Sequence, residues 1–205
     1  MDFYFIVTQL VSGFTMATLL FLVASGLTLI FGVGNIFNFA HGSFYMIGAY
    51  FGYQLVSVWK INFWIALVAA WWILAKTRPG RIARASAVDR EMLGSLGVNV
   101  PLVLTVVFGL ATALGGMAGA LAAPLRSVTP GAGIEVIIDS LIVVVLGGMS
   151  NFWGAWLGAV LLGEVNAFAV AYLPAWSTLF SYLVMVVTLI FRPEGLFAAT
   201  RLRKV

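Results

Sequence analysis

The sequence has no cysteine and very little charge. Without cysteine, the chain can form neither disulfide bonds nor thiolate metal sites. Only 9% of its 205 residues are charged, while 62% are hydrophobic. A soluble globular domain carries roughly 25% charged residues. A chain of this composition cannot solvate its own surface, and it is predicted to be an integral membrane protein.

The residues that most enzymes and nucleotide-binding proteins need are also missing. No G-x-x-x-x-G-K-[ST] motif occurs, so the chain has no Walker A loop for ATP. The single histidine, His41, has no acidic residue close to it in sequence, and Asp89 and Glu91 lie among arginines in a polar interval. Neither arrangement predicts an acid/base site. We therefore expect no enzymatic activity, no catalytic or metal-binding residues and no cofactor.

Apolar runs separated by short polar intervals make up most of the chain. They predict an all-α fold, a polytopic transmembrane helix bundle, because a membrane-spanning barrel would alternate with a period of two. We expect a single transmembrane domain over residues 1–205, with about seven apolar segments, some of them short or interrupted. The segments are 5–33, 43–58, 61–75, 102–121, 134–149, 152–173 and 176–191.

Two of these segments have unusual lengths. Segment 5–33 exceeds the roughly 20 residues that one span requires, so it is predicted to be one long helix or a helix interrupted at Gly32 and Gly34. It follows Met1-Asp2, which lacks the basic start of a signal peptide, so we expect it to stay in the membrane. Segment 61–75 would be about 22 Å long, short of the roughly 30 Å hydrocarbon core.

Small residues recur at helix-packing spacing. The pairs Gly48/Gly52 and Gly154/Gly158 match G-x-x-x-G, a spacing that lets two helix backbones approach closely. Segment 102–121 contains four glycines, and the same argument predicts tight packing along it; they are Gly109, Gly115, Gly116 and Gly119.

The polar interval 76–100 contains five of the eleven basic residues, and three more lie at the C-terminus (Arg201, Arg203 and Lys204). Basic residues favour the cytoplasmic side of a membrane. With three crossings before the interval and four after it, both clusters fall on that side. We therefore expect a cytoplasmic loop at 76–100, an external N-terminus and a cytoplasmic C-terminus, and we attribute the positive charge to topology rather than to nucleic-acid binding.

Polar residues inside or beside the spans are candidates for a solute path. Asn35, Asn38 and His41 are spaced by three and would share a face of a helix, where they could line the path, or they could instead cap a helix end. Gly42 adjoins them. Glu164 lies midway along a span, where an ionised side chain is costly, so it either borders the path or binds an interior partner.

Two carboxylates lie in the first turns of a predicted helix. Glu135 and Asp139 are four residues apart at the start of segment 134–149. Acidic residues there suit the positive end of the helix dipole, so capping is the favoured interpretation.

Three blocks of sequence resemble a known family. They are G-L-T-L-I-F-G-V-x-N-I-x-N-F-A-H-G-x-F-Y-M-x-G-A-Y (26–50), G-R-x-x-R-A-x-x-x-D-R-E-x-x-x-x-x-G-x-N-V (80–100) and V-V-V-L-G-G-M (143–149). They are similar to the branched-chain amino acid ABC transporter permeases of the LivH and LivM type. Members of that family are longer, so segment 61–75 is interpreted either as a junction of two family helices or as the site of a missing interval.

The resemblance implies a bacterial inner-membrane permease with several partners. These are membrane lipid, a second permease subunit (a copy of the chain or a different one), cytoplasmic ATPase subunits and a periplasmic substrate-binding protein. It also implies that interval 76–100 is the loop that couples ATPase closure to the spans, through charge-assisted bonds from a short helix. The candidate coupling residues are Arg81, Arg84, Asp89, Arg90, Glu91 and Gly97.

The predicted function is translocation of branched-chain or other small apolar amino acids. The alternatives are a permease for another small solute, such as an amide or a sugar, and a shortened non-transporting scaffold that docks an ATPase. An enzyme embedded in the membrane ranks third.

Overall fold

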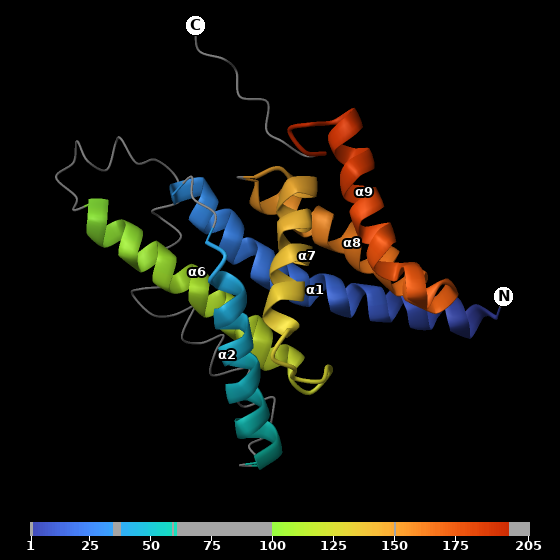
Figure 1. The fold of residues 1–205 in the computed structure, drawn as a ribbon, viewed down its shortest axis with the longest axis horizontal. Helices are drawn as coiled ribbons and strands as arrows, with labels where there is room; N and C mark the ends of the chain where they lie inside the picture. Colours follow the sequence, from blue (N-terminus) through green and yellow to red (C-terminus); the bar gives the residue numbers. More distant parts are fainter. Residues whose placement is uncertain (1, 35–37, 59, 61–99, 150, 197–205) are drawn as a thin grey trace, which may run out of the picture. The chain divides into compact units, whose positions relative to one another are not determined.

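The computed structural model describes residues 2–34, 38–58, 60, 100–149 and 151–196 (Figure 1). Every regular element in these ranges is helical, which confirms the all-α prediction. The α-helices are α1 (Phe3–Gly34), α2 (His41–Tyr53), α6 (Val100–Ala122), α7 (Ala132–Gly147), α8 (Phe152–Tyr172) and α9 (Ser177–Phe191). A π-helical turn, Gln54–Val58, extends α2, and a 3-10 turn, Pro174–Trp176, precedes α9.

Four helices in the described ranges are long and apolar enough to cross a membrane. They comprise Phe3–Gly32, Leu104–Ala122, Phe152–Tyr172 and Pro174–Phe191. The other two helices are shorter: α2 has 13 residues and α7 has 16. At 1.5 Å per residue these two are about 20 and 24 Å long, less than the roughly 30 Å hydrocarbon core.

The helices match six of the seven predicted segments. The first segment is one continuous helix over Phe3–Gly34, without an interruption at Gly32. The two carboxylates of segment 134–149 do lie near the start of α7, with Glu135 in its first turn. Segment 61–75 and the loop 76–100, except Val100, lie outside the described residues.

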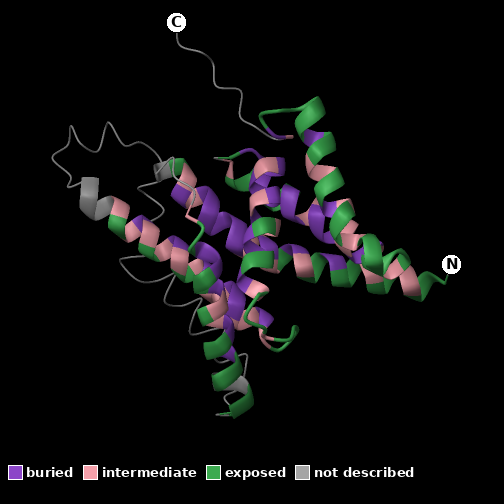
Figure 2. Cartoon of the chain, in the orientation of Figure 1, coloured by how far each residue is buried: buried purple, intermediate pink, exposed green. Residues whose placement is uncertain are grey.

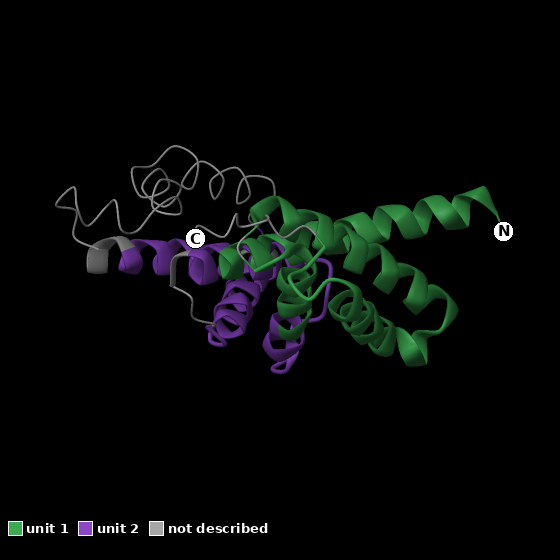
Figure 3. Cartoon of the chain, turned by 90° about the horizontal axis from the view of Figure 1, so that it is seen from above, with its two compact units in different colours: residues 1–28, 138–205 green, residues 29–137 purple. Residues whose placement is uncertain are grey.

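The chain divides into two compact units, coloured separately in Figure 3. Unit 1 comprises Met1–Thr28 and Ile138–Val205, and unit 2 comprises Leu29–Ile137. Each unit has its own buried residues, which are purple in Figure 2.

In unit 2, α2 packs along α6 through backbone contacts between small residues. A Cβ added at Gly52 would lie 2.6 Å from Cα of Ala120, and one added at Gly48 would overlap the carbonyl of Gly116. The predicted Gly48/Gly52 packing motif is therefore confirmed. In segment 102–121, a Cβ on Gly119 would overlap the Tyr45 carbonyl, whereas a Cβ on Gly109 meets no described atom within 4 Å.

In unit 1, α8 packs through small residues on two sides. A Cβ on Gly158 would lie 2.8 Å from the Val143 carbonyl oxygen of α7, so the predicted Gly154/Gly158 motif also forms a contact. A Cβ on Gly163 would lie 2.6 Å from the Gly13 carbonyl oxygen of α1. These close approaches leave no room for a larger side chain at Gly158 or Gly163.

The junctions around α7 and α8 follow ordinary helix-end rules. Gly148 has φ +92° directly after α7, a left-handed conformation that favours glycine. Asn151 begins α8 as its N-cap, where Oδ1 accepts a hydrogen bond from the Gly154 N–H at 3.1 Å. The Leu196 N–H returns to donate to the Leu146 carbonyl at 2.8 Å, which satisfies an acceptor in the last turn of α7.

Candidate functional site

The predicted coupling residues cannot be placed. Arg81, Arg84, Asp89, Arg90, Glu91 and Gly97 all lie outside the described residues, so their role stays a prediction.

The N-F-A-H-G motif forms the entry to α2. Asn38 lies outside the helix, its Oδ1 accepts from the Ala40 N–H at 3.1 Å, and its carbonyl accepts from the His41 N–H at 3.1 Å. This is a side-chain-stabilised turn that starts a helix. Asn35 lies outside the described residues. Asn35, Asn38 and His41 would share one face only if a helix ran through this stretch. Residues 38–40 are not helical, so this condition is not met.

His41 and Gly42 are both buried in unit 2. The His41 ring packs against Gly115 of α6, where an added Cβ would lie 3.0 Å from Cε1 and from Nε2. Gly42 packs against the backbone of Gly133 in the first turn of α7. Both residues therefore join α2 to its neighbours. Whether they also border a solute path stays a prediction.

Glu164 belongs to unit 1 and lies in α8, facing α1. Its Oε2 is buried and has no hydrogen-bond partner among the described residues. A Cβ added at Gly13 would lie 2.6 Å from that oxygen, so the carboxyl group fits over the glycine. Whether Glu164 borders the path or binds an interior partner stays a prediction.

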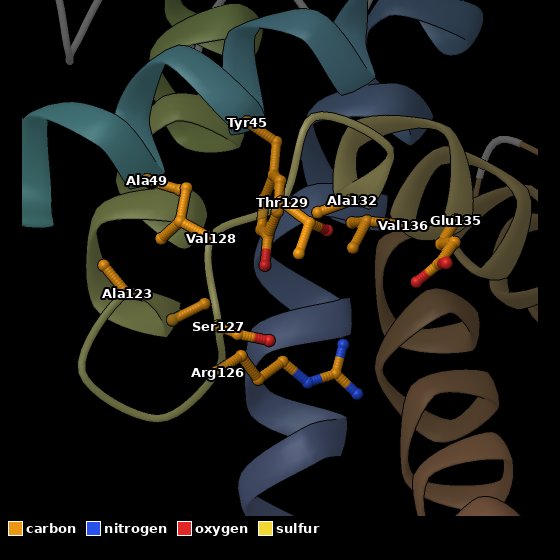
Figure 4. A pocket seen from close by; sticks show the side chains of 11 residues that line it. Tyr45, Ala49, Ala123, Arg126, Ser127, Val128, Thr129, Ala132, Glu135 and Val136 are labelled. Atoms are coloured by element: carbon orange, nitrogen blue, oxygen red, sulfur yellow. The ribbon is translucent and has the colours of Figure 1, made fainter.

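The described part of unit 2 also contains a cavity of about 310 Å³, which we call the loop pocket (Figure 4). It lies where α2, the loop after α6 and the first turns of α7 meet. It is lined by Tyr45, Ala49, Ala122, Ala123, Arg126, Ser127, Val128, Thr129, Ala132, Glu135 and Val136.

The loop pocket combines two opposite charges with hydroxyl groups and an apolar wall. Figure 4 shows the Arg126 guanidinium, the Glu135 carboxylate and the Tyr45 and Ser127 hydroxyls directed toward the same hollow. Tyr45 is buried, whereas Arg126 and Glu135 are exposed. Five of the eleven lining residues carry polar side chains, so the hollow offers several groups able to fix the orientation of a small polar molecule. In the described ranges, no three His, Cys, Asp or Glu side chains gather as metal ligands would.

Sequence reasoning missed this pocket, apart from naming Glu135 as a helix cap. Tyr45 and Ser127 carried no pattern that separated them from packing residues. Arg126 did carry a signal, because it is a basic residue in the loop expected on the side opposite both basic clusters.

Comparison with known proteins places the chain among membrane permeases. The family described as "Branched-chain amino acid transport system / permease component" matches residues 9–70 and 63–189, in two alignments. The alignments overlap at 63–70, within the segment that the sequence analysis interprets as a junction or a missing interval. No solved structure shows a significant match.

Individual relatives agree with the family match. BraD, a high-affinity branched-chain amino acid permease protein of Pseudomonas aeruginosa, is 29% identical over 82% of this chain and 55% of its own length. LivH of Salmonella typhimurium is 29% identical over 72% of the chain and 48% of its own length. The ribose import permease protein RbsC of Escherichia coli is 34% identical over 53% of the chain and 36% of its own length. The chain thus spans about half the length of these branched-chain amino acid relatives.

Proposed function

Since this chain belongs to the family of branched-chain amino acid transport permease components, we propose that it is a permease subunit of an ABC importer for branched-chain or other small apolar amino acids. The observation that carries the proposal is the family match, which extends over residues 9–189. The relatives that cover most of the chain carry the same description.

The physical character of the chain supports transport within a membrane. Four described helices are long and apolar enough to span, and close small-residue contacts hold the helices of each unit together. Few ionisable groups lie within the spans, and an apolar solute side chain needs none. Asn35, Asn38, His41, Gly42 and Glu164 are the proposed path residues.

We assign the energy source to partner subunits. The sequence has no Walker A loop, so ATP hydrolysis is proposed to occur in separate ATPase subunits that bind the 76–100 loop. A second permease subunit and an external binding protein complete the proposed complex. The membrane is proposed to be a bacterial inner membrane, with the arginine-rich loop in the cytoplasm and the N-terminus outside.

A second candidate substrate is a sugar. The ribose import permease is the most nearly identical of the three relatives, although it covers only 53% of the chain. The family match and the wider coverage by the branched-chain amino acid permeases favour the amino acid.

The test uses the complex that co-purifies with the tagged full chain from bacterial membranes. Reconstituted in liposomes with its binding protein, it should take up radiolabelled L-leucine on addition of ATP, and leucine should stimulate ATP hydrolysis. Glu91→Ala should reduce both, because the coupling loop loses a carboxylate that we assign to ATPase docking. Uptake of D-ribose alone would favour the sugar, and a bound ATPase without any uptake would favour the scaffold.

A further inference from the structure

We propose that the loop pocket is a binding site for the amino-acid solute, with Arg126 holding its carboxylate and Glu135 its ammonium group. The inference rests on the proposed function, which supplies the solute class, and goes beyond it by naming a site and its ligand contacts. None of the path residues predicted from sequence is part of this pocket.

The charges of the loop pocket match those of a free amino acid. A free amino acid is a zwitterion, with a carboxylate and an ammonium on one carbon, so its site needs one cationic and one anionic partner. Arg126 and Glu135 supply this pair from two elements on one hollow, the loop after α6 and the first turn of α7 (Figure 4). Arginine presents a planar fork of donors that matches a carboxylate with two bonds, and the glutamate accepts from an ammonium.

Hydroxyl groups complete the polar side of the pocket. Tyr45 reaches the hollow from α2, and its hydroxyl faces the same space as the Arg126 guanidinium (Figure 4). Ser127 lies next to Arg126 in the loop, and its hydroxyl also faces the hollow (Figure 4). A hydroxyl can donate to a carboxylate or accept from an ammonium, so either group can add to the fixed charges.

The rest of the lining fits an aliphatic side chain. Four alanines (Ala49, Ala122, Ala123 and Ala132) line the pocket together with Val128 and Val136. Alanines leave space beside the backbone, and the valines supply apolar contact. A volume of about 310 Å³ lies at the lower end of the range for small-molecule pockets, roughly 300–1,000 Å³. The pocket therefore suits a compact solute with charged groups at one end and an apolar chain at the other.

The position of the pocket suits the start of import. The arginine-rich loop precedes α6, and the loop that carries Arg126 follows it. The 23 residues of α6 extend about 34 Å, enough to cross the hydrocarbon core. With the arginine-rich loop in the cytoplasm, the pocket lies at the outer surface, where an external binding protein would deliver its solute.

The test measures binding of radiolabelled L-leucine to the purified full chain in lipid nanodiscs. On the unmodified chain, 3-methylbutylamine, which lacks the carboxylate, and 4-methylpentanoate, which lacks the ammonium, should each compete at least about tenfold more weakly than leucine, because each loses one charge-assisted contact. Competition by either analogue equal to that of leucine would overturn the proposal, and this measurement depends on no variant.

Two variants then assign the charges. Arg126→Gln should weaken leucine binding at least about tenfold and leave 3-methylbutylamine binding nearly unchanged. Glu135→Gln should also weaken leucine binding at least about tenfold, and it should leave 4-methylpentanoate binding nearly unchanged. The matched controls are Arg192→Gln and Glu194→Gln, which remove exposed charges outside the pocket and should bind leucine normally. Normal leucine binding by both pocket variants would overturn the assignment.

The result separates this inference from the proposed function. Leucine binding that needs both charges supports the pocket whether or not the reconstituted complex performs uptake. Uptake by a complex whose isolated chain binds no leucine, or binds it without these charges, overturns the pocket and leaves the permease function in place.

Discussion

Glu164 is an ionisable residue in the middle of an apolar helix, and its surroundings raise the question whether it has a functional role or only a packing role. One carboxylate oxygen is buried against Gly13 without a hydrogen-bond partner among the described residues. A neutral side chain at this position would make the fold more stable, since burying a charge without a partner is costly. Keeping an acid there is expected where the acid contributes to function.

We predict that Glu164→Gln leaves the fold intact and slows uptake. Glutamine keeps the shape and removes the charge, so the free energy of unfolding should stay equal or rise. L-leucine uptake by the reconstituted complex should fall on the order of tenfold if the carboxylate borders the path. Glu194→Gln, outside the helices, is the control. Uptake equal to that of the unmodified chain would identify Glu164 as a packing residue only.

At the scale of helices, length, hydropathy and glycine position were enough to predict most of the fold. Six apolar segments became helices with ends close to those expected. The chain leaves the first helix before Asn38, four residues or fewer after Gly34, and it leaves α7 before Gly148. Helix-forming signals are local, because each span must satisfy its own backbone in lipid, and local signals can be followed along a sequence.

The loop pocket could not be predicted in the same way. Tyr45 lies far in the sequence from Arg126 and Glu135, and it meets them only because α2 packs against α6 beside the start of α7. The face of α2 that meets α6 is set by glycines on both helices. The spacing of glycines along one helix does not show which glycines of the other helix they contact. Gly109 shows the limit, because it lies in the same glycine-containing segment and makes no such contact with any described residue.

The contact between α2 and α6 should therefore depend on individual glycines. We predict that Gly48→Ala lowers the free energy of unfolding in detergent by about 1–3 kcal/mol, because the new methyl group overlaps the Gly116 backbone, which cannot yield as a side chain would. Thermal unfolding followed by circular dichroism measures the change.

Gly109→Ala is the matched control on α6. Its new methyl group meets no described atom within 4 Å, and alanine favours a helix over glycine, so its stability should be unchanged or slightly higher. Equal losses in the two variants would show that glycine in these helices serves flexibility rather than contact.

At the scale of the whole molecule, the charge distribution determines which way the chain faces. Eight of the eleven basic residues lie either in the 76–100 interval or at Arg201, Arg203 and Lys204. Arg126 lies in the loop that follows α6. The proposed coupling to a cytoplasmic ATPase and the proposed outer position of the loop pocket both require the arginine-rich loop inside. One orientation therefore supports both proposals, and the opposite one removes both.

The absence of cysteine allows this orientation to be measured with single introduced thiols. In intact cells, a maleimide that cannot cross membranes should label Leu125→Cys, which replaces an exposed loop residue outside the pocket lining. Ser86→Cys should be labelled only after the membrane is permeabilised, since the positive-inside rule predicts a cytoplasmic position for its loop. Labelling of Ser86→Cys from outside would show that the orientation is the opposite of the proposed one. The loop pocket would then face the cytoplasm, where an imported solute leaves rather than enters.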